Sequence, residues 1–203
     1  MFLVGTDDKE INEYNLSTAY DVSTSVHQNI YFNGDGLDFV AIAFNTDGTK
    51  LFIYDKTGND SIKQYSLGSP FDLSNAVFQK EYTGTSSKTL REINGTPQGF
   101  AFSSDGSKMY VTGTGTKKIK EFTLSTPFDI SEATLLAGST CTEGIAADGL
   151  KVIFNSDGTK FFIVDDSTQD VSILTLTTAY DISTCSNTCL LYTSDAADEE
   201  DSV

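Results

Sequence analysis

The chain has 203 residues and a formal net charge of −16, from 29 acidic and 13 basic side chains. Nucleic acid binding needs clustered Lys and Arg, so this balance argues against DNA or RNA as a partner. No run of about 18 apolar residues occurs, so no membrane span is predicted. One histidine and three cysteines are few ligands for a metal centre, and no cofactor is expected.

One sequence motif recurs four times along the chain. An aromatic residue followed by Asp stands at Tyr20, Phe71, Phe128 and Tyr180, in steps of 51, 57 and 52 residues. An Asp-Gly pair stands at Asp47-Gly48, Asp105-Gly106 and Asp157-Gly158, in steps of 58 and 52. The longer middle step in both series indicates one insertion of about six residues. A period of this length is typical of four-stranded propeller blades, which have roughly 40–50 residues or slightly more.

The predicted blades follow one another along the chain. A partial blade covers residues 1–35, complete blades cover 36–92 and 93–142, and a partial blade covers 143–188. The first partial blade begins at what is the second strand of the later repeats. The chain is therefore predicted to be all-β, a β-propeller fragment of about three and a half blades. We expect a parent of six to eight blades to supply the remaining blades as partners, and the isolated fragment to associate.

The strands are clearest in the repeat that contains Asp105. They are predicted at 99–106, 108–113, 118–124 and 133–138. The Asp-Gly pair between the first two strands is a hairpin signal, because Gly takes a positive φ without strain and Asp caps the turn. In the third strand, Ile119, Phe122 and Leu124 do not share one face, which is expected of a strand packed between two layers. No long segment has helical periodicity.

These repeated sequence motifs resemble the YVTN-type β-propeller repeat. The match is best at Ser103, Asp105 and Gly106, followed by Tyr110-Val111, and looser in the neighbouring repeats. The added element Ser-Thr-(Ala/Pro)-(Tyr/Phe)-Asp resembles a sub-type found in phage structural and bacterial surface proteins. The resemblance implies a propeller in an extracellular, cell-surface or virion setting. It implies little about function, because propellers serve as enzymes, receptors and scaffolds.

The composition changes abruptly at Cys189. The segment CLLYTSDAADE, from Cys189 to Glu199, resembles the translation of a transposase-based sequencing adaptor. Residues 189–203 are therefore interpreted as an adaptor-derived, non-native and disordered tail of a metagenomic fragment, outside the fold. Cys141 and Cys185 remain, and whether they form a disulfide stays open, since two cysteines are not a framework.

The recurring polar residues have structural explanations. The Asp-Gly pairs (Asp47, Gly48, Asp105, Gly106, Asp157, Gly158) are interpreted as structural turns, and they lack the alternating acids of a calcium loop. In the second series each Asp is followed two residues later by Ser, so both can hydrogen-bond local backbone amides. The aromatic residue beside it is expected to fill the gap between blades. His27 is interpreted as an exposed strand residue, and no catalytic motif is recognised.

One loop set varies between repeats. Loops that join the second and third strands, and loops that join one blade to the next, differ in sequence, whereas the turns after the first and third strands repeat almost unchanged. Diversified loops are typical of recognition. The acidic residues of the loops between the second and third strands form the candidate binding rim: Asp7, Asp8, Asp55, Asp60, Asp165, Asp166 and Asp170. A cation or a polyhydroxylated ligand would relieve repulsion among clustered carboxylates. The alternative is that these loops are only solvated hairpin tips.

Two functional hypotheses remain. The first is a non-enzymatic binding or structural propeller module, which recognises a protein or a glycan through the variable loop face. The second is a lactonase- or dehydrogenase-like propeller enzyme whose catalytic residues lie in blades outside this chain. A full-length gene with its neighbours would separate the two.

Overall fold

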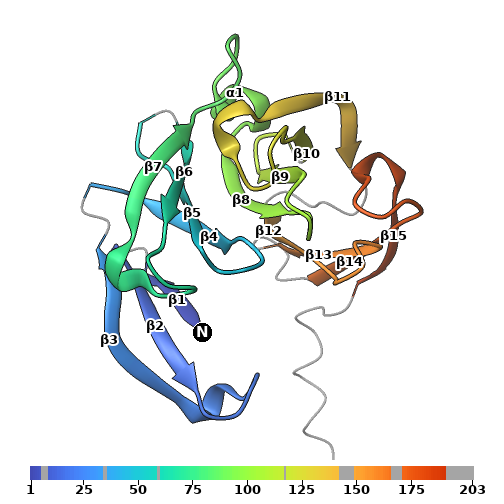
Figure 1. Ribbon diagram of the computed structural model, residues 1–203. Coiled ribbons are helices and arrows are strands. Elements are labelled where there is room, and N and C mark those ends of the chain that lie inside the picture. Colours follow the sequence, from blue (N-terminus) through green and yellow to red (C-terminus); the bar gives the residue numbers. More distant parts are fainter. Residues whose placement is uncertain are drawn as a thin grey trace, which may run out of the picture. The chain divides into compact units, whose positions relative to one another are not determined.

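A computed structural model describes residues 1–5, 9–33, 36–58, 60–116, 118–141, 149–165 and 171–190 (Figure 1). The chain divides into two compact units, Met1–Thr83 and Gly84–Val203, which are described separately. Each unit is built from two antiparallel sheets, and in each sheet the strands follow one another in chain order. Within the described part, no helix is long and apolar enough to cross a membrane.

The first unit holds a three-stranded and a four-stranded sheet. The first sheet consists of β1 (Phe2–Gly5), β2 (Glu10–Leu16) and β3 (Ser25–Asn33). The second consists of β4 (Phe39–Phe44), β5 (Lys50–Asp55), β6 (Ser61–Ser66) and β7 (Val77–Tyr82). The two sheets share one apolar core, in which Ile11 of the first contacts a layer from the second that includes Leu51, Ile53 and Leu73.

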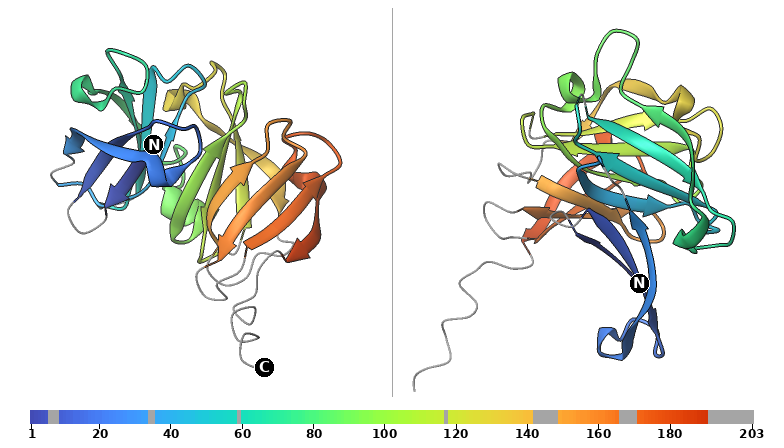
Figure 2. Two further views of the ribbon diagram at one scale, coloured as in Figure 1. Left: turned by 90° about the horizontal axis from the view of Figure 1, so that it is seen from below. Right: turned by 90° about the vertical axis from the view of Figure 1, so that its left-hand side faces the viewer.

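The second unit holds two four-stranded sheets. The third sheet consists of β8 (Pro97–Phe102), β9 (Lys108–Gly113), β10 (Lys118–Thr123) and β11 (Thr134–Cys141). The fourth consists of β12 (Gly149–Phe154), β13 (Lys160–Asp165), β14 (Val171–Leu176) and β15 (Cys185–Leu190). Figure 2 shows them side by side, and their core includes Tyr110 and Ile119 from one sheet and Phe161 and Leu174 from the other.

Four consecutive antiparallel strands make a propeller blade, so the predicted fold class, an all-β propeller, is confirmed. The fourth sheet differs from the expected partial blade, because β15 pairs with β14 and completes it. This strand includes Cys189 and Leu190, which were predicted to belong to the non-native tail. Strand pairing uses backbone groups, so the free edge of β14 can accept a following segment whatever its side chains. Tail residues 191–203 lie outside the described residues.

Short helical turns interrupt the strands. A five-residue helix, α1 (Leu90–Asn94), lies in the predicted insertion, where Thr89 and Glu92 form a capping box. A single 3-10 turn precedes the last strand of every sheet: η1 (Val22–Thr24), η2 (Leu73–Asn75), η3 (Ile130–Glu132) and η4 (Ile182–Thr184). The recurring Asp caps each turn by accepting a hydrogen bond from the amide of the Ser two residues on. The local hydrogen bonding anticipated for these Asp-Ser pairs thus has a defined role, which is to start the turn.

The aromatic residue before each capping Asp has an unexpected conformation. All four have a positive φ, namely Tyr20, Phe71, Phe128 and Tyr180 at 64°, 61°, 54° and 58°. In the last three sheets the ring lies against the turn glycine of its own sheet: a Cβ added to Gly106 would lie 2.2 Å from Cδ2 of Phe128. The amide of Phe128 also donates to the Gly106 carbonyl, at 2.9 Å. In the second, third and fourth sheets the ring therefore closes a contact within its own blade, and Tyr180 also packs against the core shared by the third and fourth sheets.

Replacement of Gly106 by alanine should destabilise the second unit by about 2 kcal/mol. Gly106 has φ +71°, which costs an alanine about 1 kcal/mol, and displacing the Phe128 ring adds about 1 kcal/mol more. Gly138 is a matched control in the same sheet, because it has φ +84° but no atom near its added Cβ. Denaturant unfolding of both variants measures the difference. Equal losses in Gly106→Ala and Gly138→Ala would show that the ring contact contributes nothing.

Candidate functional site

The predicted acidic rim is only partly described. Asp7, Asp8, Asp166 and Asp170 lie outside the described residues, and for Asp165, the last residue of β13, only the backbone is described. Asp55 and Asp60 are described, and both side chains are buried, 1% and 0% exposed. Both side chains have partners within their own sheet, and their expected role in ligand binding stays a prediction.

Asp55 and Asp60 have partners inside the second sheet. Asp55 Oδ1 accepts from the amides of Asp38 (2.8 Å) and Thr57 (2.9 Å), and Lys63 Nζ lies 3.3 Å from its Oδ2. Burial raises the pKa of Asp55, but these hydrogen bonds outweigh it and the net pKa lies below the usual range. Asp60 accepts a hydrogen bond from the Tyr54 hydroxyl at 2.8 Å. Both acids stabilise the β5–β6 hairpin.

The other singled-out residue, His27, also has a structural environment. It lies exposed on β3, where its Nε2 is 3.1 Å from Oδ1 of Asn12 and its ring is 5.0 Å from that of Tyr14. This matches the interpretation of an exposed strand residue. Within the described residues, no group of three or more His, Cys, Asp or Glu side chains is arranged to hold a metal ion.

A polar cavity lies at the junction of the third and fourth sheets. Its volume is about 310 Å³, and its walls come from β9, β10 and β11 on one side and from η4 on the other. The lining residues are Lys108, Glu121, Leu136, Ala137, Gly138, Ser139, Asp181 and Ser183. A cavity of this volume is at the small end of the range for ligand pockets in proteins.

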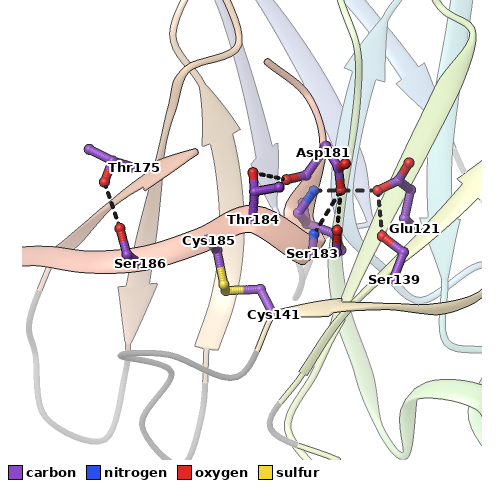
Figure 3. Close-up of a disulfide and its surroundings, with 10 residues drawn as sticks. Glu121, Ser139, Cys141, Thr175, Asp181, Ser183, Thr184, Cys185 and Ser186 are labelled. Carbon is purple, nitrogen blue, oxygen red and sulfur yellow. Dashed lines mark hydrogen bonds between the residues drawn. A yellow bond between two sulfur atoms is a disulfide. The ribbon is translucent and has the colours of Figure 1, made fainter. Parts of the chain in front are cut away.

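Glu121 is the central residue of this cavity. Its side chain is fully buried, and Ser139 Oγ donates to its Oε2 at 2.7 Å (Figure 3). The amide of Ile182, from the fourth sheet, also donates to Oε2, at 3.4 Å. Lys108 Nζ lies 2.7 Å from Oε1 and forms an ion pair with the carboxylate. Burial of a carboxylate costs free energy unless the group is paired, and Lys108, Ser139 and the Ile182 amide supply that pairing.

Two further hydrogen bonds cross the junction, with their donors in the third sheet and their acceptor in the fourth. Lys108 Nζ and the Tyr110 hydroxyl both donate to the backbone carbonyl of Tyr180, at 2.9 and 2.6 Å. Burial raises the pKa of Tyr110, so its hydroxyl stays protonated and remains a donor. The carbonyl belongs to Tyr180, the aromatic residue with positive φ. Strand β9 of the third sheet therefore contacts the turn that immediately precedes η4 in the fourth sheet.

A β-bulge in β11 supplies four of the residues that line the cavity. In β11, Thr140 pairs with Lys120 and Leu135 pairs with Phe122, so four residues, 136–139, lie opposite Glu121 alone. In the second sheet the corresponding bulge in β7 has a single extra residue, Gln79. The extra residues of β11 cannot stay in register with β10, and Gly138 takes φ +84° among them. The bulge therefore exposes the backbone beside Glu121 and creates the cavity.

A disulfide joins the two walls of the cavity. Cys141, at the end of β11, is bonded to Cys185, at the start of β15, with a Cα–Cα distance of 6.0 Å (Figure 3). Ser139 and Ser183, which both line the cavity, lie two residues from these cysteines. The pairing that the sequence left open is thus formed, and it holds β11 beside η4.

The cavity was not predicted from the sequence, although signals for it exist. Glu121 occupies the position that Gln64 has in the second sheet and Ile173 in the fourth, each opposite an aromatic residue of the preceding strand. An acid on a strand with two buried faces is a reason to look for a partner. The glycine in the outer strand, Gly138, is a bulge signal. The outer strand predicted at 133–138 ends at this glycine, whereas β11 continues to Cys141.

The chain matches no protein-family model, and no curated protein is significantly similar to it. Solved structures resemble it at low sequence identity. The nidogen/laminin complex matches with a TM-score of 0.59 at 13% identity, over 93% of this chain and 60% of that one. A protein from Lactobacillus plantarum matches with a TM-score of 0.55 at 13% identity, over 95% and 55%.

An enzyme is also among the similar structures. The periplasmic gluconolactonase of Pseudomonas aeruginosa matches with a TM-score of 0.50 at 10% identity, over 95% of this chain and 52% of that one. The chain spans 49–60% of the length of the first solved structures that it resembles. At these identities the likeness concerns the fold alone, which is that of a β-propeller.

Proposed function

We propose that this chain is a non-enzymatic binding module, and that its ligand is a polyhydroxylated molecule such as a glycan. The observation that carries the proposal is the cavity at the third and fourth sheets, which is lined by the buried ion pair of Glu121 and Lys108 together with Ser139, Asp181 and Ser183. This site is distinct from the predicted acidic rim, because neither Asp55 nor Asp60 lines the cavity.

The lining groups suit sugar hydroxyls. A hydroxyl group both donates and accepts, and the cavity offers Glu121 and Asp181 as acceptors, Lys108 as a donor, and Ser139 and Ser183 as either. The exposed aliphatic side chain of Leu136, 40% exposed, provides an apolar surface at the opening. A volume of about 310 Å³ accommodates one sugar ring and little more, so modest affinity is expected.

The setting that fits the proposal is outside the cell, on a cell surface or on a virion. The Cys141–Cys185 disulfide supports it, because such bonds persist in oxidising compartments. The YVTN-type resemblance points the same way. Protein ligands and further propeller blades of a longer protein remain partners to test beside the glycan.

Filling the cavity should weaken ligand binding. Ala137 is exposed and lines the cavity, so Ala137→Arg places a long side chain in its opening without disturbing the core. We expect saccharide affinity, measured by calorimetry across a glycan panel, to fall by at least about tenfold, equal to about 1.4 kcal/mol. Thr134→Arg is the matched control, because Thr134 is exposed on the same strand but does not line the cavity. Equal binding by both variants would remove the cavity from the proposal.

The second candidate is a lactonase, favoured by the similarity to the gluconolactonase structure. It is tested by incubating the protein with glucono-lactone and following ring opening by pH-stat titration. Turnover that is lost in Ala137→Arg would make the cavity an active site instead of a binding site. No turnover together with saccharide binding supports the binding module.

A further inference from the structure

Neighbouring sheets pack through two different faces. In the second unit, the third sheet contributes Tyr110, Ile119 and Cys141 to the shared core, and these residues define its back face. The fourth sheet contributes Phe161, Ile163, Leu174, Leu176 and Ile182, which define its front face. The first unit repeats this arrangement, because Ile11 from the back of the first sheet contacts Ile53 and Leu73 on the front of the second.

The front face of the first sheet is exposed. Val22 begins η1 as Leu73 begins η2 and Ile182 begins η4, yet Val22 is 66% exposed and the other two are 2% and 0%. Leu3 has the register position of Ile53 and is 50% exposed, whereas Ile53 is fully buried. Tyr20, beside Val22, is 98% exposed. Val22, Leu3 and Tyr20 thus form an exposed face made of the kinds of side chain that proteins usually bury.

The back face of the fourth sheet is exposed as well. Val164 has the register position of Thr112, and Val164 is 43% exposed whereas Thr112 is 3% exposed. Ile153, at the position of Ala101, is 63% exposed. Phe162, Val171 and Ile173 complete this face and are half-buried. Large exposed apolar faces of this kind mark interaction surfaces.

We propose that the back face of the fourth sheet in one copy of this chain binds the front face of the first sheet in a second copy. The contact would repeat the packing of back face against front face that each unit already contains. A polar contact supports the pairing: Lys108 at the start of β9 donates to the carbonyl of Tyr180, and Lys160 at the start of β13 is exposed. In the pair of copies, Lys160 would donate to the carbonyl of Tyr20.

This interface joins two different surfaces, so it is heterologous and leaves one free face at each end of the pair. Association can therefore continue from copy to copy unless the assembly closes. The inference concerns assembly and is independent of the proposed glycan binding, since no residue of the two proposed contact faces lines the cavity.

Sedimentation velocity over a wide concentration range tests the interface. The native chain should self-associate, and Val22→Asp or Ile153→Asp should each weaken the association by at least about tenfold, because an unpaired carboxylate would be buried. Both positions are exposed in the single chain, so the variants should fold, which circular dichroism verifies. Val77→Asp is the control, because Val77 is 57% exposed but lies on the outer strand β7 of the second sheet.

Mixing the two variants gives the sharpest result. Val22→Asp keeps an intact back face and Ile153→Asp keeps an intact front face, so an equal mixture should form a dimer that does not grow further. A native chain that stays monomeric at every concentration overturns the proposal. A mixture that remains monomeric, or a Val77→Asp variant that dissociates like the other two, also overturns it.

Discussion

Replacing Lys108 with methionine should destabilise the second unit by about 3 kcal/mol. The change leaves the fully buried carboxylate of Glu121 without its cation, and breaking a buried ion pair costs about 3–5 kcal/mol. The lower end of that range applies, because the Lys108 side chain keeps 28% of its surface exposed. The variant also loses the hydrogen bond from Lys108 to the Tyr180 carbonyl. Urea unfolding, followed by circular dichroism, measures the loss.

The loss of stability in Lys108→Met should depend on the negative charge that remains on Glu121. Glu121→Gln removes the charge and keeps an oxygen for the Ser139 hydroxyl and the Ile182 amide. The fold accepts glutamine at this position, because Gln64 occupies it in the second sheet and is 4% exposed. The double variant Lys108→Met/Glu121→Gln should therefore recover most of the stability. A double variant as unstable as Lys108→Met alone would contradict this account.

Removal of the Cys141–Cys185 bond should cost about 4 kcal/mol. The bond closes a loop with a sequence separation of 44, and the chain-entropy relation gives values between about 3 kcal/mol for 15 residues and about 4.7 for 100. Thermal unfolding of Cys141→Ala/Cys185→Ala, compared with the native chain, measures the effect. The native chain with added reductant should behave like the variant.

A thiol titration checks the bonding directly. The chain has three cysteines, and two of them form the disulfide, so one thiol should react in the unfolded, unreduced protein. Three reactive thiols, or no change in melting temperature on reduction, would show that the bond does not form in solution. Reduction should also weaken saccharide binding, because the bond holds together the two walls of the cavity.

The features that the sequence predicts are those with a local cause. Gly106 is recognisable because an Asp-Gly pair between two short strands favours a hairpin turn, and its φ of +71° agrees. The apolar pattern of Ile119, Phe122 and Leu124 indicates a strand packed on both faces, and all three are buried. Each of these signals lies within a few residues of its consequence.

The features that the sequence does not predict depend on neighbouring strands. Asp55 is an acid at a hairpin, and only the positions of Lys63 and the Asp38 amide explain its burial. The cavity depends on a register shift between β10 and β11 that places four residues opposite Glu121. The pairing of β15 with β14 depends on the free backbone groups at the edge of β14, and the residue composition of the following segment does not predict it.

The contact between the aromatic residue and the turn glycine has a consequence for how such a gene can change. Phe71 with Gly48, Phe128 with Gly106 and Tyr180 with Gly158 each make the contact inside a single repeat. Duplication or loss of one repeat by recombination would therefore transfer the contact complete, and the copy number of repeats can drift without new mutations at these turns. Glu121 differs, because its partners span one particular junction, and a duplicated copy would need fresh selection to regain them.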